Sequence, residues 1–265
     1  MIAGTSADHA FIQIITNTDS YYFRDFSPVY RKRGTLYLGG NTFSKDGLDI
    51  HIDDHAVSIH GCIRYADLTP LRYDIMGPFK FFPMQCRHKI ISLLHRLEGS
   101  LSINGEVIDF TGGTGYIEGD SGTSFPDNYM WIQCNDFYER VCISVSLADV
   151  PFAGTQFQGC IGVVYLNGVE YRMATYRGVK VLFCNENRII LKQGNLGLDI
   201  SIGPGTGHAL AAPKNGDMCR AIQERIVCGA RFLFTKNSEK LFDQYSKNAS
   251  FECVKKGVHW QNAHI

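Results

Sequence analysis

A run of polar residues near the middle of the chain carries side chains that could do acid–base chemistry. Residues 115–137 read GYIEGDSGTSFPDNYMWIQCNDF, which is two extended runs around a turn rich in Gly, Ser and Pro. Because side chains alternate between the two faces of a strand, Tyr116, Glu118 and Asp120 share one face of the first run. One face of the second run carries Tyr129, Trp131, Gln133 and Asn135.

Two neighbouring carboxylates beside a phenol are suited to proton transfer. Close carboxylates raise each other's pKa, and a carboxylic acid kept neutral by an apolar cavity can donate a proton. The ordinary alternative is that the carboxylates face solvent and Trp131 caps a core. Against it, Gly119, Gly122 and Pro126 indicate specialised backbone, and Trp131 alternates with amides rather than with charges. A polar lining inside a β-barrel is typical of a ligand cavity, so we predict a pocket here.

Two histidines and an aromatic loop precede this stretch. Alternation places His95 on an apolar face and His88 on the opposite face of one predicted strand. A buried histidine is more often a hydrogen-bonded core residue than a catalytic one, and both interpretations stay open. Residues 76–84 bracket Phe79 and other apolar residues with two prolines, which is typical of a loop over a barrel mouth or of a hydrophobic gate.

Composition excludes several classes of function. Lys+Arg and Asp+Glu balance at 26 each, so no long-range field favours nucleic acid or an anionic membrane. The nine cysteines form no C-x-x-C pair, which argues against a disulfide framework or a thiolate zinc site. No signal peptide is visible, and no apolar stretch approaches the roughly 20 residues of a membrane span. We therefore expect a cytoplasmic protein without stable membrane insertion, and its oligomeric state is not predicted.

Two further patterns resemble a phosphate-binding loop and a metal site, but neither has the full sequence signature. The glycine clusters at 112–115 and 203–207 lack the ending of a phosphate loop and indicate turns or bulges. His51, Asp53 and His55 alternate and could imitate a metal triad. However, the Asp53-Asp54 pair indicates a turn that takes His55 out of register, so an exposed hairpin tip is favoured. We expect no metal and no cofactor.

The elements that position these residues are predicted strands. Period-2 segments dominate, and Asn104-Gly105 and Asn167-Gly168 are strong signals for type I′ hairpins. Residues 217–226 fit both a strand and a helix, and residues 238–247 could pair as a strand or form a short helix. Near-regular strands with Gly-rich turns predict an all-β sandwich or antiparallel barrel. We divide the chain into an N-terminal β unit (1–114), a C-terminal β unit (115–254) and a frayed tail (255–265).

With these residues identified, the chain resembles the tocopherol cyclase family, and its bacterial members in particular. The resemblance covers about residues 11–254. It rests on Met76-Gly-Pro-Phe79, Met84-x-Cys86-x-His88 with Ser92 and His95, Glu98-Gly-Ser-Leu, the run Phe110 to Pro126, Trp131-Ile-Gln133-x-Asn135, Ala174-Thr-Tyr and Ala249-Ser-Phe-Glu252. Family members typically begin with a strand like FEGWYFK, which this chain lacks, so we expect a truncated start or a first barrel that closes differently.

The resemblance implies a fold and a reaction. The fold is two tandem lipocalin-like antiparallel β units of barrel or sandwich type. The reaction is cofactor-independent, acid-catalysed ring closure of a prenylated aromatic or polyene lipid, an isomerase-type activity. A phenol hydroxyl adds across a prenyl double bond through a carbocation-like state, which requires a proton donor. The alternative is a non-catalytic carrier of a hydrophobic small molecule.

The family chemistry assigns roles to the candidate residues. Glu118 or Asp120 would donate the proton, and Trp131 and Tyr116 would stabilise positive charge by cation–π contact. Gln133, Asn135 or His95 would orient or deprotonate the phenol. The predicted catalytic residues are therefore Glu118, Asp120 and His95. The predicted substrate-binding residues are Tyr116, Trp131, Gln133, Asn135, Phe79 and His88.

Overall fold

The computed structural model describes residues 1–152 and 155–255. Its regular structure is almost entirely antiparallel β-strand, with two short 3-10 helices, η1 (Gly77–Phe81) and η2 (Thr175–Arg177). The all-β prediction is confirmed. All but the first residue of the predicted tail, 255–265, lies outside the described residues. The nine cysteines are all free thiols, as their scattered spacing indicates.

The first half of the chain forms two sheets. A three-stranded sheet is followed by an eight-stranded sheet in the order β10-β9-β8-β7-β6-β5-β4, with β11 paired to β9. The strands are β1 (Ile2–Thr5), β2 (Ala10–Ile15), β3 (Ser20–Arg24), β4 (Val29–Lys32), β5 (Thr35–Leu38), β6 (Asn41–Ser44), β7 (Gly47–Asp53), β8 (Ser58–Ala66), β9 (Cys86–Ile103), β10 (Glu106–Asp109) and β11 (Thr114–Gly122).

The second half forms one ten-stranded sheet in the order β15-β14-β13-β12-β21-β20-β18-β17-β16, with β19 paired to β20. The strands are β12 (Tyr129–Cys134), β13 (Val141–Phe152), β14 (Thr155–Leu166), β15 (Val169–Ala174), β16 (Lys180–Asn185), β17 (Arg188–Gln193), β18 (Leu196–Gly205), β19 (His208–Lys214), β20 (Asp217–Lys236) and β21 (Glu239–Val254). In the described chain, the end strands of each large sheet do not pair with each other, so the two units are open sheets.

The predicted turns explain how these strands connect. Asn104 and Gly105 have φ values of 52° and 87°, and Asn167 and Gly168 have 46° and 91°. Positive φ at both central residues is what a type I′ hairpin requires, and Asn and Gly adopt it most readily. The two ambiguous segments are both strands, because residues 217–226 begin β20 and residues 239–247 begin β21.

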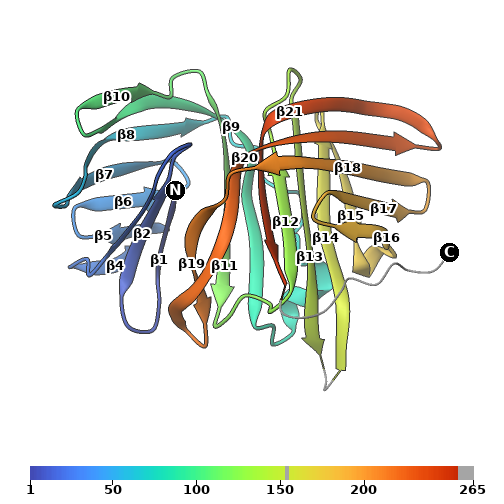
Figure 1. Ribbon diagram of the computed structural model, residues 1–265, viewed down its shortest axis with the longest axis horizontal. Helices are drawn as coiled ribbons and strands as arrows, with labels where there is room; N and C mark the ends of the chain where they lie inside the picture. The colour runs from blue at the N-terminus through green and yellow to red at the C-terminus, as the bar shows by residue number, and fades with distance from the viewer. Residues whose placement is uncertain (153–154, 256–265) are drawn as a thin grey trace.

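The two halves lie side by side, with long strands running through the middle of the molecule (Figure 1). Two of these strands, β9 and β20, are 18 and 20 residues long. One end of β9 pairs with β11 in the middle, and its other end pairs with β8 and β10. The hydrogen-bonded sheet changes between β11 and β12, whereas the division into domains at residue 114 stays a prediction.

A shared core and specific polar contacts hold the halves together. Leu93 on β9 is fully buried and packs with Cys142 and Val163 of the second half. Burying a leucine side chain contributes about 1.5–3 kcal/mol. The Gln13 amide on β2 donates to the backbone carbonyl of Ala211 on β19 (2.9 Å) and accepts from its N–H (2.8 Å). The first sheet is therefore docked against the second half of the chain, opposite β11.

Candidate functional site

The two polar runs form strands β11 and β12, which belong to different sheets. β11 pairs with β9, whereas β12 lies between β13 and β21 at the centre of the ten-stranded sheet. Met130 and Ile132 of β12 enter the core of the second half. Tyr129, Trp131 and Gln133 alternate with them and line a cavity on the opposite face. Successive side chains of β12 therefore point alternately into the core and into the cavity.

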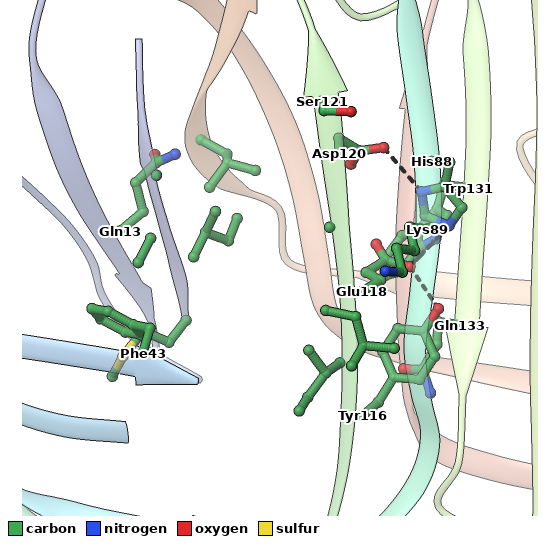
Figure 2. Close-up of a pocket in the computed structure, with 18 of the residues that line it drawn as sticks. Gln13, Phe43, His88, Lys89, Tyr116, Glu118, Asp120, Ser121, Trp131 and Gln133 are labelled. Atoms are coloured by element: carbon green, nitrogen blue, oxygen red, sulfur yellow. Dashed lines mark hydrogen bonds and ion pairs between the residues drawn. The ribbon is translucent and has the colours of Figure 1, made fainter. Parts of the chain in front are cut away.

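A cavity of about 2290 Å³ lies between the N-terminal strands and the central strands. Figure 2 shows Gln13 and Phe43 on one side of the cavity, with Tyr116, Glu118, Asp120 and Trp131 across from them. Both halves of the chain contribute to the lining. The predicted pocket-lining stretch thus lies where the two halves meet.

His88 lies between the two predicted acids (Figure 2). Its Nδ1 is 3.0 Å from Asp120 Oδ1, and its Nε2 is 3.3 Å from Glu118 Oε2. Burial by itself lowers the pKa of His88. The charge of Glu118 and the hydrogen bond to Asp120 outweigh burial and raise this pKa well above 6.5. His88 is therefore an imidazolium at neutral pH and forms a charged triad with Glu118 and Asp120.

Glu118 accepts hydrogen bonds from two further side chains at the same oxygen. The Tyr116 hydroxyl donates to Glu118 Oε2 at 2.6 Å, and Trp131 Nε1 donates to it at 3.3 Å. Burial, followed by the charge of Glu118, raises the pKa of Tyr116 well above 10, so this phenol keeps its proton. The triad, the phenol and the indole form one hydrogen-bonded group on the cavity wall.

A second acidic group, which sequence reasoning did not select, lines the same cavity. Glu252 on β21 accepts a hydrogen bond from the Tyr129 hydroxyl at 2.6 Å. It pairs in register with Trp131 on one side and with Glu224 on the other. Burial and the neighbouring Glu224 raise the pKa of Glu252 to about 8. Glu252 is therefore a neutral acid at neutral pH. The only sequence signal was its place in the family motif Ala249-Ser-Phe-Glu252.

The structure buries His95 in the core, where it also belongs to the lining of the cavity. Its side chain is buried, its Nδ1 is 3.2 Å from Ser92 Oγ, and its ring lies 4.6 Å from that of Tyr65. Burial lowers the pKa of His95 to about 4, so it is neutral at neutral pH. A Cβ at Gly115 would overlap the His95 ring. This geometry agrees with the core interpretation, and a catalytic role stays a prediction.

The other predicted substrate-binding residues divide into two groups. Gln133 and Phe79 line the cavity. Gln133 donates a weak bond to Cys142 Sγ, and Phe79 in η1 stacks on Phe157. Asn135 is not among the cavity-lining residues, and its amide donates to the Gly115 carbonyl at 3.1 Å. Asn135 thus positions β11 rather than contacting the cavity.

The triad could also offer ligands to a metal ion, since one atom from each of its residues lies within 4.8 Å of the others. However, His88 contacts Asp120 and Glu118 through different ring nitrogens, which point in diverging directions. One ion bound to either nitrogen would replace only one of these contacts. The observed arrangement is a hydrogen-bonded group of three titratable side chains.

Comparison with known proteins finds one matching family model. Residues 54–155 match the family model described as tocopherol cyclase-like. Over this stretch the chain is tocopherol cyclase-like. The matched residues include β9 and β11, which carry the whole triad, and also β12. No curated protein matches the chain.

Three solved structures share the fold of this chain. Kievitone hydratase from Nectria haematococca is 15% identical, with a TM-score of 0.53 over 94% of this chain and 86% of the hydratase. CghA, solved with Sch210972, is 7% identical, with a TM-score of 0.54 over 93% and 79%. A putative AttH from Nitrosomonas europaea is 11% identical, with a TM-score of 0.50 over 89% and 75%. The predicted lipocalin-like arrangement of two β units is confirmed.

The described residues were also searched for membrane-spanning helices. Neither of the short helices in residues 1–152 and 155–255 has the length and apolar character that crossing a membrane requires.

Proposed function

We infer that the chain is an acid–base cyclase that closes a ring in a prenylated aromatic or polyene lipid. The observation that carries this proposal is the charged triad, in which His88 holds a proton between Glu118 and Asp120 at a cavity wall. The family match over residues 54–155 supports it. One structural neighbour is named as a hydratase, a class of enzyme that adds water across a double bond.

Ring closure is an isomerisation, so the protein delivers one proton and takes one back. In the proposed reaction, the His88 proton passes through Glu118 to an alkene carbon, and Asp120 holds the imidazole in place. The adjacent carbon becomes a tertiary cation, and the substrate's phenol oxygen bonds to it. The phenol proton then returns to the triad, which restores the starting state.

The surrounding residues suit a cationic intermediate. Trp131 and Tyr116 are held by Glu118, and their ring faces can stabilise positive charge by about 0.5–2 kcal/mol. Gln133 lines the cavity and can orient the phenol. Glu252 is a second candidate donor, because its raised pKa keeps it protonated on the same cavity. Apolar side chains such as Phe43 and Phe79 fit a hydrocarbon chain.

The size of the cavity favours one alternative, a carrier of a hydrophobic small molecule. Ligand sites usually measure about 300–1,000 Å³. A cavity of about 2290 Å³ could hold a long lipid without any chemistry. A carrier does not need a protonated histidine between two carboxylates, so the cyclase is the better-supported function.

Glu118→Gln separates the two functions. The amide keeps the shape of the side chain but cannot pass a proton, so turnover of a prenylated hydroquinone should fall by about 10²- to 10⁴-fold. Binding of the same hydroquinone, measured by fluorescence of Trp131, should change much less. Glu239→Gln at the start of β21, an exposed acid that does not line the cavity, serves as the matched control and should keep full turnover. Equal turnover in both variants would contradict the proposed role of Glu118, and binding without turnover by the unmodified chain would favour a carrier.

A further inference from the structure

A second group of metal-ligating side chains lies outside the cavity, on the outer face of the hairpin formed by β7 and β8. His51 and His60 are directly opposite each other in the register of these strands. Ile50, Ile52 and Ile59 alternate with them and are buried, so the two histidines point away from the core. The two Nδ1 atoms are 3.0 Å apart.

Asp53 fixes the tautomer of His60. Its Oδ1 lies 2.8 Å from His60 Nε2 and also accepts a hydrogen bond from the Ser58 hydroxyl at 2.9 Å. His60 therefore carries its proton on Nε2, which leaves the Nδ1 lone pair directed toward His51. A carboxylate that orients a histidine in this way is the usual outer partner of a metal-ligating imidazole.

The separation of the two nitrogens fits one shared ion. With metal–nitrogen bonds of about 2.0–2.1 Å, two ligands at angles from octahedral to tetrahedral lie about 2.9–3.4 Å apart. The observed 3.0 Å falls in this range. When the Nε2 atom of His51 carries a proton, on the side of Asp53 Oδ2 at 3.9 Å, both Nδ1 atoms are available together.

We propose that His51 and His60 bind a divalent transition-metal ion of the Zn²⁺, Ni²⁺ or Cu²⁺ class, with Asp53 as the positioning carboxylate. Imidazole nitrogen favours these ions over Mg²⁺ and Ca²⁺, which favour oxygen. The side chains of His51 and Asp53 are 71% and 64% exposed, so water completes the coordination and the ion can exchange. None of the three residues lines the cavity, so this site does not depend on the proposed cyclase function.

This site differs from the triad considered from sequence. His55, the third member of that pattern, is exposed in the turn between β7 and β8, as the Asp53-Asp54 turn signal indicated. The register between β7 and β8 instead places His60 opposite His51, where the sequence pattern had suggested His55. The neighbouring His55 therefore provides a matched control that differs in geometry but not in residue type.

The test is a calorimetric titration of the full chain with Zn²⁺ alone. His51→Ala and His60→Ala should each weaken Zn²⁺ binding by more than about 10-fold, and Asp53→Asn by about 10- to 100-fold. His55→Ala should bind as the unmodified chain does. His88→Ala, measured in parallel, removes the cavity triad and should leave this binding intact. The proposal is overturned if the unmodified chain does not bind Zn²⁺, or if His51→Ala and Asp53→Asn both bind it unchanged.

Discussion

The two walls of the cavity carry acids in opposite charge environments. On the wall formed by β9 and β11, Glu118 and Asp120 each contact the imidazolium of His88. On the wall formed by β12, β20 and β21, Glu252 contacts the Tyr129 hydroxyl and lies beside Glu224. No ion pair to Glu252 is found in the part of the chain that the structure describes. The imidazolium makes the first wall a charged triad, whereas burial and the neighbouring Glu224 keep Glu252 on the second wall a neutral acid.

This difference shows how one cavity can hold protons in two forms. The first wall holds its proton on a base that carboxylates surround, so the proton can pass along hydrogen bonds. The second wall holds its proton on a carboxylic acid whose ionised form is penalised by burial. Variants that remove the histidine, the buried acid or the hydrogen bond between the walls test whether the imidazolium and burial cause this difference.

The largest change should come from His88→Gln, which removes the cation from the first wall. Breaking a buried ion pair by removing one partner typically costs about 3–5 kcal/mol, although partial exposure of Glu118 and Asp120 should place this variant at the lower end. Because the pKa of His88 is raised, its stabilisation is complete below pH 6.5 and is lost as pH rises through the folded-state pKa. Denaturant unfolding should therefore show a larger deficit at pH 6 than in strongly alkaline buffer. An equal deficit at both would contradict a protonated His88.

The second prediction concerns Glu252→Gln, which removes the titrating acid from the other wall. The pKa of Glu252 is raised from 4.5 to about 8, so between these values the folded state holds a proton that the unfolded state has lost. The stability of the unmodified chain should fall as pH rises through this window, by up to about 1.4 kcal/mol per pH unit.

The glutamine variant should lose that contribution, and its thermal unfolding temperature should vary less between pH 5 and 8. The exposed variant Glu239→Gln is the control and should keep the slope of the unmodified chain. An unchanged slope in Glu252→Gln would mean that this acid is ionised in the folded state.

The smallest effect should come from Trp131→Phe, because Trp131 on the second wall contacts the first wall through one hydrogen bond. It donates to Glu118 from the strand next to Glu252. Phenylalanine keeps a ring but loses the donor, and one hydrogen bond to a charged group contributes about 1.5–3 kcal/mol. The bond is long at 3.3 Å, so turnover should fall by only about 10-fold. A loss as large as that of Glu118→Gln would assign Trp131 a direct role in the chemistry.

The strands were predictable from the sequence because their signals are local. Alternation and the Asn-Gly turns depend on residues next to each other, and both hairpins formed as expected. The polar faces of β11 and β12 followed from the same alternation. Sequence reasoning could therefore find Glu118, Asp120 and Trp131 as residues lining one cavity.

The partners of these residues were not predictable, because they depend on register between distant strands. His88 meets Asp120 through the pairing of β9 with β11, which has irregularities near Ile117. Glu252 meets Trp131 through the pairing of β12 with β21, across more than half of the second unit. Such long-range pairings leave no local pattern. The repulsion between two carboxylates that was expected from the sequence is replaced by a histidine between them.

The most direct test of the account is ring closure in D₂O. The triad exchanges its protons with solvent, so the proton that it adds to the alkene should be a deuteron. A prenylated hydroquinone incubated with the chain should give a cyclised product with one deuterium on the former alkene carbon, detected by mass spectrometry. Glu118→Gln should give almost none of this product. Cyclised product without deuterium, or no product from the unmodified chain, would contradict a cavity that donates protons.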